Sequence, residues 1–246
     1  MHRLGLIGKD ISYSFSKAYF SKQFERDNLP FTYENFDLQH ISEFNSLIEK
    51  NPSIVGFNVT IPYKEEIIPL LDSLHPQAKQ IGAVNTITVN KNGQLKGFNT
   101  DFYGFKKSIK PLLQLHHKTA LILGTGGASK AITYALEDLG ISFDYVSRTL
   151  KKGTKFTYKM LTSEIIEQYT IIINCTPLGT YPNIDNCPDI PYDSITNKHL
   201  LYDLVYNPGE TKFLKLGKYK GAQICNGYKM LQYQADKAWE IWNTAL

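Results

Sequence analysis

Residues 119–129 read Thr-Ala-Leu-Ile-Leu-Gly-Thr-Gly-Gly-Ala-Ser, a short apolar run that leads directly into a glycine-rich loop. The run 119–123 predicts a buried strand. A helical pattern follows the loop as far as Leu139, where Gly140 is suited to end the helix. A glycine loop between a strand and a helix is typical of dinucleotide-binding domains, because free N–H groups at the helix start bind phosphate. The stretch therefore predicts a βα unit that holds a pyrophosphate.

The residues of this loop have separate expected roles. Gly124 makes the tight turn, and Gly126 lets the backbone approach the pyrophosphate, while Ser129 replaces the third glycine of the usual pattern. The alternative is a tight turn in some other α/β protein. The expected cofactor contacts in the loop are Gly124, Gly126, Gly127, Ala128 and Ser129.

The end of the next expected strand, 142–146, indicates which nicotinamide cofactor fits. A protein that prefers NAD usually has Asp or Glu there to bind the ribose 2′-OH. This chain has Ser147-Arg148-Thr149, with Lys152 just beyond, and Asp144 lies within the strand itself. A guanidinium can bind a 2′-phosphate that a carboxylate would repel. We therefore predict NADP, with Ser147, Arg148, Thr149 and Lys152 at the phosphate; the alternative for Arg148 is solvated surface charge.

The alternation of strands and helices over the whole chain predicts two α/β domains. Expected strands are 4–8, 33–37, 54–60, 83–90, 94–98, 119–123, 142–146, 171–174, 200–205 and 222–224, and Asn92-Gly93 predicts a hairpin. Expected helices include 18–26, 41–50, 64–74 and 230–242. The fold class is α/β, with an N-terminal substrate domain (1–101, completed by the C-terminal helix 227–246), a doubly wound Rossmann-like NADP domain (102–226), and an interdomain cleft.

Composition excludes several classes of protein. The chain of 246 residues is 42% hydrophobic and 20% charged, with a mild net charge of +4, so neither a disordered chain nor a nucleic-acid-binding stripe is indicated. Three cysteines without CxxC spacing indicate neither a disulfide framework nor a metal site. Neither a signal peptide nor a membrane-spanning run is visible. We expect a cytoplasmic protein with a small-molecule partner.

Several segments resemble the shikimate dehydrogenase family in both order and spacing, over nearly the whole chain. They are Ser14-Phe15-Ser16, residues 58–66 (Asn-Val-Thr-Ile-Pro-Tyr-Lys-Glu-Glu), residues 82–86 (Gly-Ala-Val-Asn-Thr), Asn99-Thr100-Asp101 with Gly104, the loop at Gly124, Ser147-Arg148-Thr149, and Met230-Leu231 with Gln234. The resemblance implies the reversible, NADPH-dependent reduction of 3-dehydroshikimate to shikimate, a step in aromatic amino-acid biosynthesis.

By resemblance, Lys64 and Asp101 form the catalytic pair. Read alone, Lys64 stands near the start of the expected helix 64–74, where a cation opposes the helix dipole, and a surface lysine is the simpler reading. Asp101 read alone is an N-cap of the helix that holds Phe105. In the family reading Lys64 is the candidate donor of a proton to the oxygen on which charge builds during hydride transfer. Asp101 would orient and ionise the ammonium of Lys64 and hold a substrate hydroxyl, and the sequence leaves open which of the two residues is the formal acid.

The remaining site residues also follow from the resemblance. Ser14 and Ser16 would bind the substrate carboxylate at a helix start, although simple N-capping would explain them as well. Thr60, Asn85 and Gln234 would bind hydroxyls, Tyr206 would lie near the carboxylate, and Gly227 and Met230 would approach the cofactor. Three departures from the family pattern are Phe15 (often Lys), Lys17 (often Pro) and Lys229 (commonly Gly).

Three other functions fit part of the sequence. A quinate or quinate/shikimate dehydrogenase that uses NAD would be expected to have a threonine at position 16 and an acidic residue near Ser147, and this chain has neither. A non-catalytic NADP-binding regulator on the same fold has no need of Lys64 and Asp101 together. A generic α/β binding module explains only the glycine loop. The expected assembly is a monomer or a homodimer.

Overall fold

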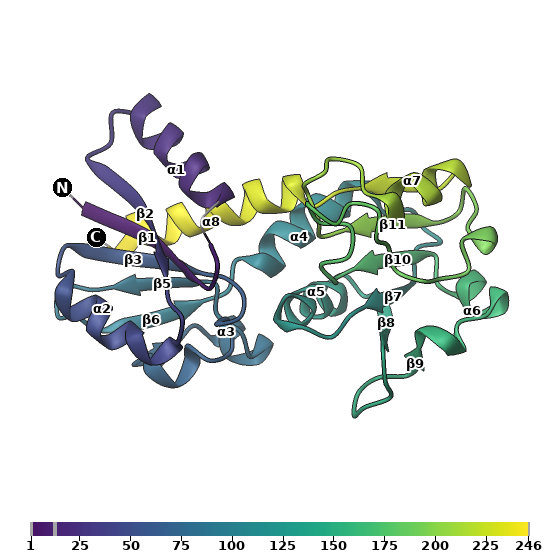
Figure 1. Cartoon of the computed structure of the whole chain (residues 1–246), viewed down its shortest axis with the longest axis horizontal. Coiled ribbons are helices and arrows are strands. Elements are labelled where there is room, and N and C mark those ends of the chain that lie inside the picture. The colour runs from purple at the N-terminus through teal and green to yellow at the C-terminus, as the bar shows by residue number, and fades with distance from the viewer. Residues whose placement is uncertain (1, 12–13, 246) are drawn as a thin grey trace. The chain divides into compact units, whose positions relative to one another are not determined.

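The computed structural model describes residues 2–11 and 14–245, and the chain divides into two compact units (Figure 1). Unit 1 comprises the residues up to Thr100 and those from Ala235 onward; unit 2 is Asp101–Gln234. Each unit is built on its own six-stranded sheet, so the prediction of two α/β domains is confirmed. The long C-terminal helix α8 (Tyr228–Ala245) contributes its first seven residues, as far as Gln234, to unit 2 and the rest to unit 1.

The sheet of unit 1 is mixed and has the strand order β2-β1-β3-β5-β6-β4. Strands β1, β2 and β3 are parallel, whereas β5 runs antiparallel to both β3 and β6. The hairpin between β5 and β6 turns at Gly93, whose φ of +77° favours glycine, so the predicted hairpin is confirmed. The strands are β1 (His2–Gly8), β2 (Phe31–Asp37), β3 (Ile54–Val59), β4 (Ser73–Leu74), β5 (Thr86–Val89) and β6 (Leu95–Phe98).

Aromatic side chains from distant parts of the chain form one core of unit 1. Phe20 of α1 stacks on Tyr33 and meets Trp242 of α8. The indole of Trp242 is 1% exposed and donates a hydrogen bond of 2.9 Å to the carbonyl of Ile87. A Cβ on Gly56 would lie 2.4 Å from that indole nitrogen, so only glycine fits there. The helices of unit 1 are α1 (Phe15–Arg26), α2 (Phe44–Lys50) and α3 (Pro76–Ile81), with short 3-10 turns η1 (Ile41–Glu43) and η2 (Ile68–Leu70).

All neighbouring strands in the sheet of unit 2 are parallel, and their order is β9-β8-β7-β10-β11-β12. Numbered from β7 along the chain, this is the order 3-2-1-4-5-6 of the doubly wound dinucleotide-binding fold. The switch point therefore lies between β7 and β10. The strands are β7 (Thr119–Leu123), β8 (Ser142–Ser147), β9 (Phe156–Thr157), β10 (Ile171–Asn174), β11 (Leu200–Asp203) and β12 (Gln223–Cys225).

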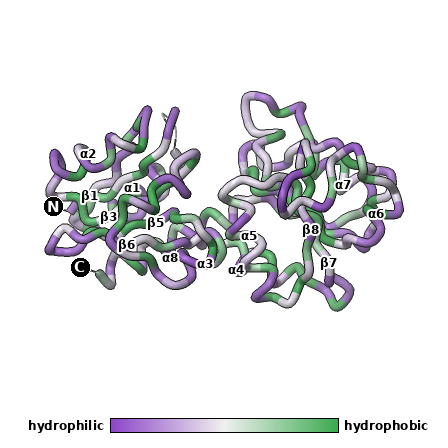
Figure 2. Tube along the Cα trace, turned by 90° about the horizontal axis from the view of Figure 1, so that it is seen from below, coloured by the Kyte–Doolittle hydropathy of each residue, from purple (hydrophilic) through white to green (hydrophobic). Residues whose placement is uncertain are grey.

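Helices cover both faces of this sheet, as the alternation of buried residues requires. Ala120 and Ile122 of β7 pack in a core with residues of α4, α5 and α8, whereas Leu121 and Leu123 pack on the other face with α6 and α7. The central strands are mostly hydrophobic and the connecting loops largely hydrophilic (Figure 2). The remaining elements of unit 2 are α4 (Asp101–Ile109), η3 (Lys110–Leu112), α5 (Gly127–Asp138), η4 (Tyr158–Met160), α6 (Ser163–Gln168), η5 (Tyr192–Ser194) and α7 (Lys212–Tyr219).

The predicted helix 64–74 is wrong. Residues 61–67 form turns, a short 3-10 turn follows, and the segment ends in β4. The backbone at the end of this segment pairs with β6 instead of forming a helix. The amides of Asp72 and His75 donate hydrogen bonds to the carbonyls of Leu95 and Gly97. Pro69 adds a residue without an N–H, which a regular helix does not accommodate. Among the described residues, none of the helices has the length and apolar character needed to cross a bilayer.

Candidate active site

Five of the predicted residues in unit 1 lie at one edge of its sheet. Ser14 and Ser16 follow β1, Thr60 and Lys64 follow β3, and Asn85 precedes β5, which runs antiparallel to β3. The amide of Thr60 donates to the carbonyl of Ile7 at 2.8 Å, which ties the end of β3 to the end of β1. A Cβ on Gly8 would lie 2.5 Å from the methyl carbon of Thr60. Glycine at position 8 therefore permits this close approach.

The two serines after β1 are held differently. Ser14 is the N-cap of α1 and accepts a hydrogen bond of 3.2 Å from the amide of Lys17, so the capping role considered for it is confirmed. Ser16 forms a hydrogen bond with Tyr33, and burial raises the pKa of this tyrosine while that bond opposes the rise. The phenol of Tyr33 donates in turn to the side chain of Asn58 at 2.7 Å. Ser16 is thus connected to the polar interior of unit 1.

Asn85 is the centre of a buried set of hydrogen bonds. Its side-chain oxygen accepts from the amide of Thr100 at 2.7 Å, and its side-chain amide donates to the Thr100 hydroxyl at 3.0 Å. The hydroxyl of Thr86 donates to the same oxygen at 3.1 Å, and Asn58 donates to the backbone carbonyl of Asn85. Asn85 is 3% exposed and Thr100 is inaccessible. This satisfied network fixes the orientation of the Asn85 amide.

Lys64 lies on a turn that is anchored on both sides. Its backbone carbonyl accepts a hydrogen bond of 2.7 Å from the amide of Val84. The preceding Tyr63 is 3% exposed and donates its hydroxyl to the carbonyl of Leu38 at 2.6 Å. No helix begins at Lys64, so the argument from an opposed helix dipole does not apply. The side chain of Lys64 is half-buried, and its position is set by the turn.

Asp101 and Gln234 belong to unit 2, where α4 and α8 pack together. Asp101 begins α4, a position at which the helix dipole favours a carboxylate, and it is 6% exposed. A Cβ on Gly104, one turn later, would lie 2.4 Å from the carbonyl oxygen of Met230 and 3.0 Å from the Cβ of Gln234. Glycine at position 104 therefore lets the two helices touch, and it places Gln234 against α4.

The glycine loop of unit 2 has the geometry expected of a phosphate loop. Gly124 has a φ of +99°, and a Cβ there would lie 2.9 Å from the methyl carbon of Thr176, so both conformation and space require glycine. Gly126 is the N-cap of α5, no side chain caps this helix, and the space beside the α-carbon of Gly126 is open. The first turn of α5 thus offers backbone N–H groups to a ligand.

Ser129 is used inside the loop. Its hydroxyl donates to the carbonyl of Gly126 at 2.7 Å, its amide donates to the same carbonyl, and the residue is 1% exposed. Ser129 therefore shapes the first turn of α5, in the place where the usual pattern has a third glycine.

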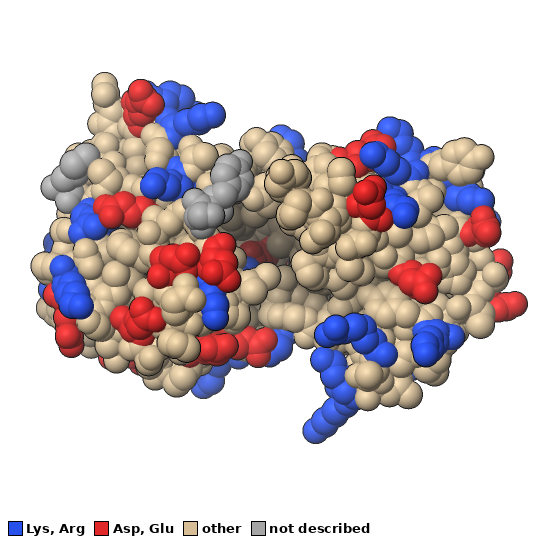
Figure 3. All heavy atoms as spheres, in the orientation of Figure 1, with Lys and Arg blue, Asp and Glu red and all other residues tan. Residues whose placement is uncertain are grey.

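The end of β8 has a cation and no free carboxylate. Asp144 lies inside β8 and accepts from Lys155 at 2.8 Å and from Tyr169 at 2.6 Å. Beyond the strand, Arg148, Thr149 and Lys152 are exposed, whereas the hydroxyl of Ser147 is bonded to the carbonyl of Thr149. Figure 3 shows Lys and Arg side chains at the place where Figure 1 draws the connection between β8 and β9. This end of β8 is suited to an anion.

The C-terminal residues predicted to approach the cofactor lie where β12 ends and α8 begins. A Cβ on Gly227 would lie 2.2 Å from the carbonyl oxygen of Leu204, so only glycine fits. Met230 is 6% exposed and packs in the core with α4 and α5, while Lys229 is exposed on α8. The departure at Lys229 therefore leaves the contact at Gly227 intact. Tyr206 is half-buried in the loop after β11.

A polar cluster that was not predicted from the sequence lies at the carboxyl ends of β10 and β11, next to the switch point. Asn174 ends β10, Asp203 ends β11, and their side chains are hydrogen-bonded at 2.9 Å. Thr176, which lies against Gly124, donates to Asn174, and Thr211 donates to Asp203. A polar residue at the end of a buried parallel strand is a visible signal, because ligands bind at the carboxyl ends of such strands.

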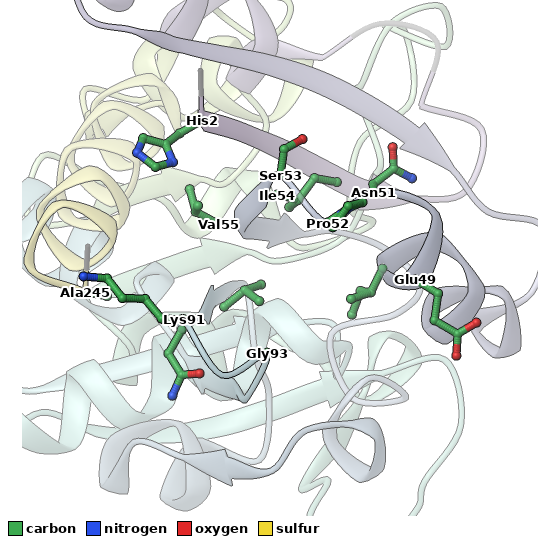
Figure 4. A pocket seen from close by; sticks show the side chains of 13 residues that line it. His2, Glu49, Asn51, Pro52, Ser53, Ile54, Val55, Lys91, Gly93 and Ala245 are labelled. Atoms are coloured by element: carbon green, nitrogen blue, oxygen red, sulfur yellow. The ribbon is translucent and has the colours of Figure 1, made fainter.

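A cavity in unit 1 lies away from the predicted site residues. Figure 4 shows it in unit 1, with a volume of about 790 Å³, where His2, Asn51 and Ser53 lie near the starts of β1 and β3 and Lys91 lies on the β5–β6 turn. This is the edge of the sheet opposite to Ser14 and Thr60, because β1 and β3 are parallel. None of the predicted site residues lines this cavity.

Known proteins resemble this chain over its whole length. A shikimate dehydrogenase (NADP(+)) from Clostridium botulinum is 40% identical over 98% of this chain and 96% of its own length. The crystal structure of shikimate dehydrogenase 1 from Peptoclostridium difficile is 39% identical, with a TM-score of 0.85 over 100% of this chain and 93% of that one. The chain belongs to the shikimate dehydrogenase family.

Two further findings locate this likeness. The family model described as the shikimate dehydrogenase substrate binding domain matches residues 6–87, a range that contains Ser14, Ser16, Thr60, Lys64 and Asn85. A shikimate 5-dehydrogenase from Thermus thermophilus, solved in complex with NADP(H) and shikimate, is 30% identical with a TM-score of 0.88 and covers 100% of this chain and 95% of its own. The shikimate dehydrogenase fold therefore extends over both units.

Proposed function

We propose that this protein is an NADP-dependent shikimate dehydrogenase, which reversibly reduces 3-dehydroshikimate to shikimate. Membership of the family is the observation that carries the proposal, since the likeness extends over 98% of the chain to a relative with this activity. Two features of the chain support it independently. Unit 1 gathers polar side chains at one sheet edge, and unit 2 has a phosphate loop with a cation at the end of β8.

On the substrate side, hydroxyl and amide groups bind the ring substituents. Ser14 and Ser16 hold the substrate carboxylate at the start of α1, where the helix dipole and free N–H groups favour an anion. Thr60 and Asn85 bind ring hydroxyls, and Asn85 is rigid because Thr100 and Thr86 hold its side-chain oxygen. Gln234 binds a hydroxyl and Tyr206 lies near the carboxylate. Side chains that are already fixed lose little conformational entropy when they bind and orient the substrate.

Lys64 and Asp101 are the acid–base pair. The ammonium of Lys64 hydrogen-bonds the ketone oxygen and stabilises the negative charge that develops on it. The carboxylate of Asp101 holds a substrate hydroxyl. The ammonium of Lys64 supplies the proton on the new hydroxyl, because an ionised carboxylate has no proton to give. The anchored turn at Lys64 supports this role, because it restricts where the side chain can reach.

On the cofactor side, the residues of unit 2 fit NADP, which when bound supplies or accepts the hydride. The open space at Gly126 and the uncapped first turn of α5 suit a pyrophosphate. Arg148 binds the 2′-phosphate, since a guanidinium recognises phosphate through paired hydrogen bonds. The residues assigned to the cofactor are Gly124, Gly126, Gly127, Ala128, Ser129, Ser147, Arg148, Thr149, Lys152, Gly227 and Met230.

Absorbance at 340 nm tests the whole proposal. The purified protein is assayed with shikimate or quinate, each with NADP⁺ or NAD⁺, and kcat/KM is measured for all four pairs. Shikimate with NADP⁺ should give the highest value. A protein that oxidises quinate with NAD⁺ faster would be the rival dehydrogenase, and a protein that binds NADP⁺ without turnover would be a regulator.

The proposed enzyme works in the cytoplasm, as a monomer or a homodimer, with small molecules as its partners. Light scattering of the purified chain distinguishes the two assemblies.

A further inference from the structure

Asp203, the last residue of β11, is a buried carboxylate with only neutral partners. It is completely inaccessible, and one oxygen accepts hydrogen bonds from Asn174 at 2.9 Å and from the amide of Val205 at 3.0 Å. The other oxygen accepts from the hydroxyl of Thr211 at 2.6 Å. Within the described part of the chain, Asp203 takes part in no ion pair. A buried charge without a cation is destabilising, so packing alone does not explain this residue.

Through Asn174, hydrogen bonds connect Asp203 to the loop after β10. The side-chain oxygen of Asn174 accepts from both the amide and the hydroxyl of Thr176, at 3.0 and 2.6 Å, and its nitrogen donates to the carbonyl of Leu178 at 3.3 Å. An ionised carboxylate only accepts hydrogen bonds, so Asn174 must turn its NH₂ group toward Asp203. This orientation leaves the oxygen for Thr176, whose methyl group lies against Gly124 of the phosphate loop.

Asp203 also holds both ends of the loop after β11, which carries Tyr206. Val205 at the start of this loop donates its amide to Asp203, and Thr211 at the end donates its hydroxyl. Thr211 is the N-cap of α7, so the start of this helix is part of the same cluster. The amide of Gly227 donates to the carbonyl of Val205 at 3.2 Å, which brings the start of α8 onto the loop.

We propose that Asp203 is a positioning residue for the dehydrogenase: its carboxylate sets the loops 175–179 and 204–211, and through them the cofactor site at the switch point. The inference rests on the proposed function for its catalytic consequence, but its effect on cofactor binding can be measured without turnover. It predicts that cofactor binding depends on the ionisation of a group that does not touch the cofactor.

The pKa of Asp203 lies in a pH range in which the binding of NADP⁺ to the folded protein can be measured. Burial raises its pKa to about 6, against the hydrogen bonds from Thr211, Val205 and Asn174, which lower it. The titratable groups that interact with it are Cys175, Tyr192 and Tyr202, and burial raises the pKa of each, so all three stay neutral between pH 5 and 8. Once protonated, Asp203 carries a hydrogen that needs an acceptor, and one of its three donors loses its partner.

The test measures the dissociation constant of NADP⁺ by fluorescence titration from pH 5 to 8.5, for wild type and Asp203→Asn. The 2′-phosphate itself titrates in this range, but it cancels in the ratio of variant to wild type. At pH 8 the ratio should be roughly 10–100, the loss expected for a charge-assisted hydrogen bond. It should approach 1 near pH 5, where the wild type has lost the same charge. A ratio that is constant with pH would overturn the proposal.

A second pair of variants keeps the test decisive if Asp203→Asn does not fold. Thr211→Ala removes a hydrogen bond that lowers the pKa of Asp203, so the wild-type loss of NADP⁺ affinity should move to higher pH. Thr211→Ser keeps the hydroxyl and should restore the wild-type profile. Identical profiles for these two variants would contradict the positioning role, because a merely structural residue does not move a titration.

Two controls separate this inference from the proposed function. Asp193→Asn removes an exposed carboxylate from the same unit, paired with Lys220, and should leave the pH dependence of binding unchanged. The thermal midpoint of Asp203→Asn at pH 8 should be no lower than that of wild type, because the lost charge is a buried one. A protein that shows the pH-dependent ratio but does not oxidise shikimate would overturn the proposed function and support the role of Asp203 in cofactor binding.

Discussion

At the scale of single residues, Lys64, the proposed acid–base group, lies on a turn that hydrogen bonds anchor on both sides. The buried phenol of Tyr63 and the amide of Val84 hold the backbone on both sides of its α-carbon. No helix begins at Lys64, so its ammonium does not oppose a helix dipole. This arrangement separates the structural role of the turn from the proposed role of the ammonium.

Lys64→Ala should lower kcat for shikimate oxidation by roughly 10²–10⁴-fold, the usual contribution of a positioned acid–base group. NADP⁺ affinity should change little, because Lys64 belongs to unit 1. Steady-state assays and a binding titration measure the two quantities. Lys79→Ala, which removes an exposed lysine from α3 of the same unit, is the matched control and should retain wild-type kcat. Near-normal turnover of Lys64→Ala would remove Lys64 from the mechanism.

Arg148 should discriminate NADP from NAD. Because a charge-assisted hydrogen bond contributes about 1.5–3 kcal/mol, Arg148→Ala should weaken NADP⁺ binding by roughly 10–150-fold and leave NAD⁺ binding nearly unchanged. Titrating both cofactors into wild type and variant measures this. Lys215→Ala, an exposed cation on α7, controls for net charge. Equal weakening of both cofactors would mean that Arg148 packs against adenine and does not recognise the phosphate.

At the scale of elements, the sequence predicted best where one strand or turn decides its own structure. The strands 119–123 and 171–174 have the predicted bounds, and the hairpin at Gly93 is present. The segment 64–74 failed because pairing of Asp72 and His75 with β6 overrides its local pattern. Contacts between distant strands could not be predicted from local sequence patterns, because the order of strands in the sheet creates them. Examples are the hydrogen bonds of Asn85 with Thr100 and of Asn174 with Asp203.

The two serines at the start of α1, Ser14 and Ser16, should differ in their effects on stability when each is replaced by alanine. Ser14→Ala removes both the N-cap and a proposed carboxylate ligand, so it should reduce the free energy of unfolding by about 1 kcal/mol and also raise KM for shikimate. Ser16→Ala removes no N-cap and should raise KM for shikimate by roughly 10-fold or more while lowering kcat less, because the carboxylate lies away from the reacting carbon. Urea unfolding and steady-state assays on both variants measure the contrast. A Ser16 variant that loses stability but keeps its KM would assign Ser16 to the fold alone.

At the scale of the whole molecule, ionisable groups buried in unit 2 set the response of stability to pH. His117 and His199 are 4% and 3% exposed, and each accepts a backbone N–H at Nδ1, from Gln114 and Thr196. An imidazole that accepts at one nitrogen must be neutral, and burial lowers the pKa of both residues from 6.5. Asp203 acts in the opposite direction, since its pKa is raised to about 6.

These groups predict how the free energy of unfolding changes between pH 7 and 5. As the pH falls below 6.5, unfolding lets both histidines take up protons, so each contributes stability that is present above 6.5 and is lost in acid. Native Asp203 binds a proton that the unfolded chain binds only nearer pH 4, which partly offsets this loss. With two protons favouring the unfolded state and one favouring the native state, the free energy of unfolding should fall by about 1.4 kcal/mol for each unit by which the pH is lowered near pH 5.5.

Two variants test these assignments. His199→Asn, whose side-chain oxygen can still accept the amide of Thr196, should flatten this slope toward zero, and Asp203→Asn should steepen it toward about 2.7 kcal/mol per unit. Urea unfolding at half-unit steps of pH measures all three slopes. A wild-type slope of the opposite sign would show that His117 and His199 are not neutral in the folded protein.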